Sequence, residues 1–302
     1  MKQDVQIGPL KLKNPVVAAS GTFGFGREMA AWQDLSLLGG ICSKGLTLKP
    51  RLGNQTPRVA ETASGLLNSV GLQNPGLAVF LADELPFMTR LGCSVIVNVA
   101  GHHAEDYLEL CRQLDRTAVD AIELNLSCPN VREGCMSIGS DGKQIERLVS
   151  QARQMTKKPL WAKLTPNVTS IGDMARAAEA GGADAVVLIN TLLGMVIDRR
   201  TRRPVLRNNT GGLSGPAIKP VALRMVSEVY QAVKIPVIGV GGIMNGSDAL
   251  EFLIAGASAV EIGSANLISP TACQDILKQM TDLAEEDHVT AFSDYTGTLN
   301  LW

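Results

Sequence analysis

A cysteine follows a short apolar run near the middle of the chain, in the segment 123–130 with the sequence ELNLSCPN. The run reads as a buried strand that stops at Cys128, where Pro129 forces the chain to turn. A loop that leaves a strand end is held by a rigid element and can reach into a cleft. A thiol there, three residues after the amide of Asn125, is placed to act as an acid–base group. The alternative is that Cys128 is a small buried apolar residue, as most free cysteines are.

Two lysines stand at the ends of other apolar runs, Lys44 after the residues ICS and Lys163 after LWA. A lysine inside a buried strand costs free energy unless it is paired, and this favours a ligand nearby. One interpretation is a Schiff-base aldolase, in which a desolvated lysine attacks a carbonyl group. The other is a cation that stabilises negative charge developing on a cofactor.

Four asparagines stand at predicted strand ends: Asn68, Asn98, Asn125 and Asn190. Amides donate and accept hydrogen bonds but do no acid–base chemistry, so they suit recognition of an edge rich in N–H and C=O groups. A planar heterocycle fits the set better than a sugar phosphate. For any single asparagine, a buried structural role is the alternative.

Glycines mark the ends of the last two apolar runs, GVGG at 239–242 and EIGS at 261–264. Glycine lets backbone N–H groups approach a phosphate closely, although it also serves in tight turns. At the final two strands of a barrel such glycines indicate a phosphate site. The ligand is then a phosphorylated substrate or cofactor.

The elements that must position these groups are short apolar runs, each followed by a polar turn and a helical pattern. Many of the runs are apolar through most of their length, as parallel strands buried on both faces should be. The predicted strands are Pro15–Ser20, Gly40–Leu46, Ser94–Gly101, Ala121–Ser127, Leu160–Leu164, Ala183–Asn190, Pro236–Gly241 and Ala259–Gly263. The predicted helices are Ala104–Leu114, Gln144–Met155, Ile171–Ala180, Lys219–Val233, Asn245–Ala255 and Pro270–Glu286.

Eight parallel strands with outer helices predict an α/β fold, a single (β/α)8 barrel domain over residues 1–302. A doubly wound sheet is the alternative, disfavoured by near-even strand spacing and by the lack of a GxGxxG fingerprint after the first strand. Two segments break the pattern, Thr47–Asn74 and Leu192–Leu213. Both follow barrel strands, so we expect them over the C-terminal mouth as lids or substrate walls, with subunit contacts as the alternative.

Composition excludes several classes of protein. The 302 residues are 45% apolar and carry a formal net charge of −1, so no basic field attracts nucleic acid. No window is long and apolar enough for a membrane span, and the N-terminus lacks the apolar core of a signal peptide. The six cysteines show no C-x-x-C spacing, so we expect reduced thiols in a cytoplasmic protein and no metal site.

These residues carry a resemblance that covers nearly the whole chain. The chain resembles the catalytic subunits of dihydroorotate dehydrogenases, flavin enzymes of pyrimidine synthesis. The asparagine–cysteine loop NLSCPN and the segment around Asn68 are specific to this family and its relatives, whereas the glycine pairs are not. The matching segments are NP at 14–15, ASG at 19–21, SKG at 43–45, NSVGLQN at 68–74, NLSCPN at 125–130, GGLSGP at 211–216 and GVGG at 239–242.

The resemblance implies a barrel that binds flavin mononucleotide (FMN), one per chain, and dihydroorotate or orotate. The residues implied for FMN are Ser20, Gly21, Lys44, Gly45, Asn98, Asn125, Lys163, Ile189, Gly215, Gly241, Gly242, Gly263 and Ser264. Those implied for the substrate are Lys44, Asn68, Ser69, Val70, Gly71, Leu72, Asn125, Asn190 and Thr191.

The resemblance also implies the chemistry. Cys128 takes the proton from C5 of dihydroorotate while a hydride leaves C6 for the flavin N5, and Lys163 stabilises the reduced flavin. A free thiol holds little thiolate at neutral pH, so a cation must help, and Lys44 is our hypothesis for that cation. Cys135, in a glycine-flanked loop, is the rival thiol.

Within the family the chain is most similar to the soluble, NAD-linked type 1B. That type passes electrons to a partner subunit carrying FAD and a [2Fe–2S] cluster, in a heterotetramer of two catalytic and two partner chains. This chain lacks a spaced cysteine set for such a cluster and a dinucleotide fingerprint. The alternatives are a fumarate-linked type 1A enzyme, a dihydropyrimidine dehydrogenase-like subunit acting on uracil or thymine, a Schiff-base aldolase, and a flavin-binding scaffold without activity.

Overall fold

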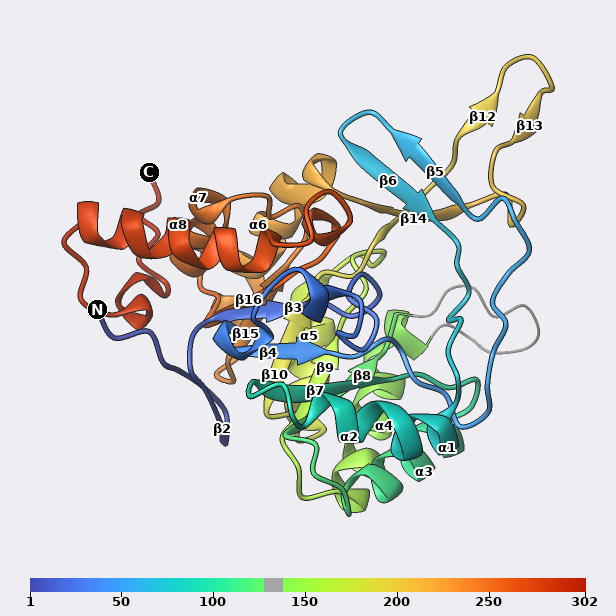
Figure 1. Cartoon of the computed structure of the whole chain (residues 1–302), viewed down its shortest axis with the longest axis horizontal. Helices are drawn as coiled ribbons and strands as arrows, with labels where there is room; N and C mark the ends of the chain where they lie inside the picture. Colours follow the sequence, from blue (N-terminus) through green and yellow to red (C-terminus); the bar gives the residue numbers. More distant parts are fainter. Residues whose placement is uncertain (128–137) are drawn as a thin grey trace.

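The computed structural model of the chain describes residues 1–127 and 138–302. Within these ranges eight parallel strands close into a barrel in the order β10-β15-β16-β3-β4-β7-β8-β9 (Figure 1). The predicted (β/α)8 barrel is confirmed, and every barrel strand lies inside one of the predicted apolar runs. The barrel strands are β3 (Val16–Ala18), β4 (Gly40–Cys42), β7 (Ser94–Val99), β8 (Ala121–Asn125), β9 (Leu160–Lys163), β10 (Ala185–Leu188), β15 (Val237–Val240) and β16 (Ala259–Ile262).

The barrel strands are buried on both faces, which explains their nearly continuous apolar sequence. Every residue of β9, β10, β15 and β16 is buried. Parallel pairing runs without a break around the ring, for example between β8 and β9 and between β16 and β3. The few polar side chains on these strands therefore stand out, because each must find a partner inside the barrel or at its end.

Helices surround the barrel, as Figure 1 shows. All six predicted helices are confirmed, and their observed ends lie within two residues of the predicted ends. They are α3 (Ala104–Leu114), α4 (Gly142–Met155), α5 (Ile171–Ala180), α6 (Lys219–Ala232), α7 (Gly246–Ile254) and α8 (Ala272–Glu286). Side chains of Asp141, Ser170 and Asn245 cap the first turns of α4, α5 and α7.

The first two connections are less regular. Between β3 and β4 the described chain makes the 3-10 turns η1 (Met29–Ala31) and η2 (Leu35–Leu37). Between β4 and β7 an unpredicted helical segment runs through α1 (Leu77–Val79), the π-helical turn η3 (Phe80–Glu84) and α2 (Leu85–Met88). Pro86 has no N–H to donate to the helical ladder, and this breaks the pattern that would have revealed the segment.

The two long insertions join each other. The strands β11 (Leu192–Gly194), β14 (Gly211–Ser214), β6 (Gly65–Asn68) and β5 (Val59–Thr62) form one antiparallel sheet in that order. A second hairpin, β12 (Ile197–Asp198) with β13 (Arg203–Pro204), projects beyond it (Figure 1). Both insertions were expected at the C-terminal mouth, but their strands were not predicted, because they are short and several contain glycine.

The remaining elements are small. The hairpin of β1 (Val5–Ile7) and β2 (Leu10–Leu12) packs Val5, Ile7 and Leu12 into the core. Single helical turns lie at η4 (Ile138–Ser140), η5 (Pro216–Ile218), η6 (Ser264–Leu267) and η7 (Phe292–Tyr295). Among the described residues, the helices are too short or too polar to cross a membrane.

Candidate active site

One cavity of about 460 Å³ lies where the barrel strands end and the insertion sheet begins. Its walls combine residues that follow barrel strands with residues of β6 and β14, as expected for the C-terminal mouth of a barrel. The predicted site residues that line it are Ser20, Gly21, Lys44, Gly45, Asn68, Val70, Gly71, Leu72, Asn98, Asn125, Lys163, Ile189, Asn190, Thr191, Gly215, Gly241, Gly242, Gly263 and Ser264.

Two predicted residues fall outside this set. Ser69 is buried beside the cavity but does not line it, and its backbone carbonyl accepts a hydrogen bond from Asn54 at 2.8 Å. Its predicted contact with the substrate stays a prediction without support from the geometry. Cys128, like its rival Cys135, lies outside the described residues, so the assignment of the base stays a prediction.

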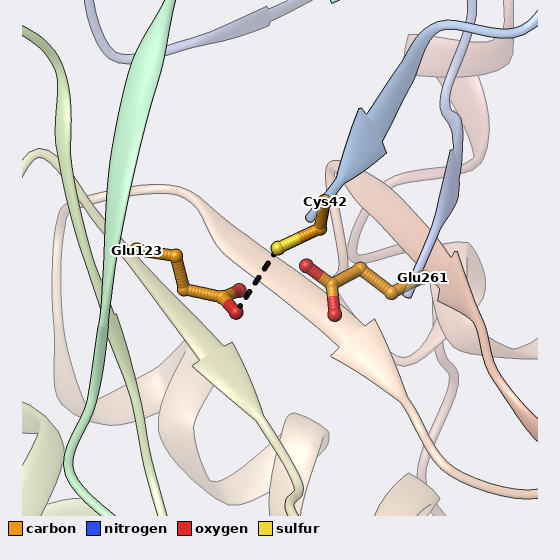
Figure 2. A group of neighbouring side chains, drawn as sticks. All are labelled: Cys42, Glu123 and Glu261. Carbon is orange, nitrogen blue, oxygen red and sulfur yellow. Dashed lines mark hydrogen bonds between the residues drawn. The ribbon is translucent and has the colours of Figure 1, made fainter. Parts of the chain in front are cut away.

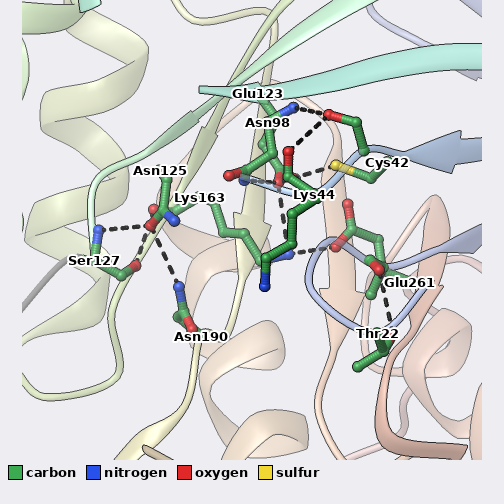
Figure 3. A network of polar contacts seen from close by, with 12 residues as sticks. Thr22, Cys42, Lys44, Asn98, Glu123, Asn125, Ser127, Lys163, Asn190 and Glu261 are labelled. Atoms are coloured by element: carbon green, nitrogen blue, oxygen red, sulfur yellow. Dashed lines mark hydrogen bonds and ion pairs between the residues drawn. The ribbon is translucent and has the colours of Figure 1, made fainter. Parts of the chain in front are cut away.

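Lys163 ends β9 and is buried, and its ammonium is held by two carboxylates (Figure 3). Its Nζ lies 2.5 Å from Oε2 of Glu261 on β16 and 3.6 Å from Oε1 of Glu123 on β8. From sequence alone, the free-energy cost of burying this lysine indicates a ligand. The structure shows that protein carboxylates provide the pairing, while Lys163 still lines the cavity.

Burial and charge shift the pKa values of this cluster. Burial acts to lower the pKa of Lys163, but the charges of Glu123 and Glu261 outweigh it and hold that pKa well above its usual value. Burial, followed by the negative charge of Glu123, raises the pKa of Glu261 to about 8. A Schiff-base lysine must lose its proton to attack a carbonyl, so Lys163 is unsuited to the aldolase interpretation.

Cys42 on β4 completes the cluster, and Figure 2 shows its thiol between the two glutamates. Its Sγ donates to Oε1 of Glu123 at 3.3 Å. Burial, and then the charge of Glu123, hold the pKa of this thiol well above its usual value. Ligand atoms of Cys42, Glu123 and Glu261 lie within 4.8 Å of one another. Because the ammonium of Lys163 already contacts both carboxylates, we assign the cluster to this lysine rather than to a metal ion.

No sequence-based prediction included Cys42, Glu123 or Glu261 in the site. A signal was present, because each glutamate interrupts an apolar barrel strand, within AIELN at 121–125 and AVEI at 259–262. A fully buried carboxylate requires a partner as much as a buried lysine does.

Asn98 on β7 links this cluster to the cavity. Its Nδ2 donates to Oε1 of Glu123 at 2.6 Å, whereas its Oδ1 is buried without a partner among the described residues. A methyl group at Gly45 would stand 3.0 Å from that oxygen, so glycine relieves crowding beside it. An unsatisfied buried acceptor in a cavity wall is ready for a ligand N–H group.

The other amides form a second polar group (Figure 3). Oδ1 of Asn125 accepts from Nδ2 of Asn190 at 3.4 Å and from the backbone N–H of Ser127 at 3.2 Å. Oδ1 of Asn190 accepts from the backbone N–H of Thr191 at 2.8 Å. Nδ2 of Asn68, on the insertion sheet, donates to Gly212 at 3.5 Å. The four predicted amides thus line one cavity from two different sheets.

Lys44 is the cation in the described wall that has no protein partner. Half-buried just after β4, its ammonium forms no ion pair or hydrogen bond with a described residue. Burial, and then the positive charge of Arg58, lower its pKa. A partly desolvated ammonium gains free energy when an anion binds beside it.

Glycines form the wall near β15 and η5. Gly242 has a φ of +76°, which disfavours any side chain, and a methyl there would stand 2.8 Å from the carbonyl oxygen of Gly215. By contrast, a methyl at Gly263 would meet only the Cβ of Ala19 at 3.8 Å. A side chain at Gly242 would therefore collide with the backbone of Gly215 and Lys219, and this close packing requires glycine there.

Comparison with known proteins agrees with this geometry. The family model described as dihydroorotate dehydrogenase matches residues 3–283. A relative from Geotalea uraniireducens, named dihydroorotate dehydrogenase B (NAD(+)), catalytic subunit, is 51% identical over 98% of this chain and 97% of its own length. Relatives with the same name are 52% identical in Pelobacter propionicus, over 99% of both chains, and 50% identical in Bacillus pumilus, over 93% and 91%. The chain belongs to the dihydroorotate dehydrogenase family.

Proposed function

We infer that this chain is an NAD-linked dihydroorotate dehydrogenase that oxidises (S)-dihydroorotate to orotate in the biosynthesis of pyrimidines. The observation that carries this inference is near-full-length identity of about 50% to relatives named as such catalytic subunits. The cavity suits this substrate, because a flat ring with amide edges and a carboxylate finds five asparagines there and one lysine without a partner among the described residues.

The substrate carboxylate is assigned to Lys44. This ammonium has no partner among the described residues, and burial lowers its pKa. An anion beside it would therefore stabilise the charged form of the lysine. Uracil and thymine have the same ring edges but no carboxylate. The unpaired cation therefore favours orotate over the substrates of a dihydropyrimidine dehydrogenase.

The residues present fit FMN as the cofactor. The buried Oδ1 of Asn98 lacks a partner and suits an N–H group of a flavin ring. Gly241, Gly242, Gly263 and Ser264 would hold the phosphate, since they line the cavity just after β15 and β16 and glycine lets backbone N–H groups approach an anion. When bound, this flavin supplies the hydride acceptor.

The chain's own residues then orient the substrate and move a proton. Asn125 is held by Asn190 and by the backbone of Ser127, which leaves its side chain fixed for recognition of the ring. Lys163 stays protonated between its two glutamates and keeps a positive charge at the cavity. Cys128 removes the C5 proton in this proposal, and the positive charge of Lys44 helps to supply the thiolate.

A partner subunit that carries FAD and a [2Fe–2S] cluster belongs to the same proposal, as does a heterotetramer of two chains of each kind in the cytoplasm. The names of the relatives, which specify NAD(+) and a catalytic subunit, support it. The sequence has no GxGxxG fingerprint of its own, so NAD would bind to the other protein.

The test is an anaerobic titration of the purified chain. We expect a flavin spectrum that bleaches on addition of dihydroorotate, and tight binding of orotate but not of uracil. Lys44→Met should abolish this preference and retain the flavin. A colourless chain, or one bleached by dihydrouracil instead, would refute the assignment.

A further inference from the structure

The cluster around Lys163 contains two buried carboxylates for one cation. Glu123 and Glu261 are fully buried, and the ammonium of Lys163 lies 3.6 Å and 2.5 Å from them. If both carboxylates were ionised, with Cys42 as a neutral thiol, the cluster would carry a net charge of −1 in a place closed to water. One added proton makes it neutral, and a low-dielectric site favours that state.

Hydrogen bonds decide which glutamate takes this proton. Oε1 of Glu123 accepts hydrogen bonds from Nδ2 of Asn98 at 2.6 Å and from Sγ of Cys42 at 3.3 Å. It also lies 3.6 Å from Nζ of Lys163. Such donors stabilise a carboxylate. Among the described residues, Glu261 has the ammonium of Lys163 alone on its Oε2. Each glutamate also has one oxygen that is buried without a described partner, Oε2 of Glu123 and Oε1 of Glu261, so the difference lies in the number of donors on the other oxygen. The proton therefore belongs on Glu261, in agreement with the burial-driven rise of its pKa to about 8.

The surrounding barrel strands add no other charge. The titratable groups that face Glu261 are Lys163, Glu123 and Cys42, from β9, β8 and β4. Of the remaining barrel strands, β3, β10 and β15 carry only apolar residues and glycine, and β7 carries Ser94 and Asn98 but no titratable group. Lys44 lines the same cavity but pairs with no member of the cluster. The charge balance of Glu261 is thus set by these few groups and by whatever occupies the cavity.

We propose that Glu261 holds an exchangeable proton that the Glu123–Glu261 pair binds more tightly when the flavin is reduced. The inference rests on the proposed function, because it needs a flavin in the cavity that Lys163 lines. Hydride transfer adds negative charge to that cavity, and this charge opposes ionised carboxylates that share Lys163 with it. At pH values where both carboxylates are ionised while the flavin is oxidised, reduction of the flavin draws one proton from solvent onto Glu261. Reoxidation of the flavin returns this proton to solvent. Glu261 is then a positioning residue that acts through Lys163.

The pH dependence of the flavin reduction potential tests this coupling. For a two-electron couple, each proton taken up on reduction changes the equilibrium constant tenfold per pH unit. This change corresponds to about 30 mV in the reduction potential. In the full chain with its flavin, we expect a slope of about 30 mV per pH unit near pH 7, from the hydride alone. Above about pH 8 the slope should steepen to about 60 mV per pH unit, because Glu261 adds a second proton.

Glu261→Gln should keep the shallow slope up to pH 10, since an amide cannot take the proton. The matched control is Glu228→Gln, which removes an exposed carboxylate paired with Arg224 on α6 and should behave as the unsubstituted chain does. If Glu261→Gln does not fold, proton uptake on reduction of the unsubstituted chain in weak buffer still decides. A second proton per flavin above about pH 8 supports the coupling.

Different results would contradict the role of Glu261 and the proposed function. A chain that bleaches with dihydroorotate but keeps the shallow slope and takes up no second proton would overturn the role of Glu261 and leave the proposed function intact. A steep slope retained in Glu261→Gln would also overturn the role of Glu261, because the second proton would then bind to another group. A chain that binds no flavin would overturn both.

Discussion

Replacing Glu261 by glutamine should flatten the dependence of the unfolding free energy on pH. In the folded chain, burial and the charge of Glu123 raise the pKa of Glu261 to about 8, whereas the unfolded chain has the ordinary value of 4.5. Between these values the folded state holds a proton that the unfolded state has lost. Stability from this group is therefore fully present below about pH 4.5 and is lost as pH rises through about 8.

The magnitude follows from the shift. The interval from 4.5 to about 8 spans about three and a half pH units, and each unit corresponds to about 1.4 kcal/mol. The upper bound is thus roughly 5 kcal/mol, and relaxation around the cluster lowers it, so we expect a fall of about 2–4 kcal/mol between pH 5 and 8. Glutamine mimics the protonated acid and should remove most of this slope.

Few other described groups have a shifted pKa that acts in this window. The carboxyl groups with lowered pKa values, such as Glu109 at about 2, lose their protons at lower pH. Burial raises the pKa of Cys93 to about 11 and that of Cys111 to about 12, so these thiols act at higher pH. Among the described residues with a shifted pKa, Glu261 is the one whose pKa in the folded chain lies near the top of the range from pH 5 to 8.

Urea unfolding at several pH values, with the same saturating FMN in every sample, measures the effect. The control is Glu228→Gln, whose exposed carboxylate should leave the slope unchanged. Parallel curves for Glu261→Gln and the unsubstituted chain would refute the reasoning, because they would place no proton on Glu261 in this range.

Further changes test other parts of the site. Lys44→Met should raise the unfolding free energy by about 1 kcal/mol, because it removes a desolvated charge without a described partner; calorimetry measures this change. The same variant should bind orotate at least about tenfold more weakly, which a binding titration measures. Gly242→Ala should cost roughly 2 kcal/mol of stability and release FMN, whereas Gly263→Ala, with open space at its Cβ, should fold normally. Cys128→Ala should lower turnover by about a hundredfold or more and retain the flavin spectrum; if Cys135→Ala does so instead, the base is misassigned.

The barrel was predictable from sequence because its signals are local. Strands such as Ala185–Leu188 and Val237–Val240 are apolar throughout, since helices cover their outer face and side chains fill the interior. Amphipathic helices such as Ile171–Ala180 begin at a capping serine and follow a clear period. The insertion sheet was not predictable, because pairing of Gly212 with Asn68 joins segments that are 144 residues apart.

The site residues were predictable where they stand at strand ends. In a parallel barrel all C-terminal ends meet at one mouth, so Lys44, Asn98, Asn125 and Asn190 had to converge once the fold was known. Ser69 shows the limit of this reasoning. It belongs to the same segment as Asn68 and Val70, yet it is buried and is not among the residues that line the cavity, so its contact with the substrate stays a prediction.

The glutamates were missed because only one side of the charge balance was considered. The cost of burying Lys163 was assigned to a ligand, although Glu123 and Glu261 stand in equally apolar strands and carry the same cost with opposite sign. Three buried charges on three barrel strands satisfy one another only in part, since two negative groups face one positive group. The surplus negative charge must be met by a proton or by the contents of the cavity, and this requirement makes the cluster sensitive to the redox state of a cofactor bound there.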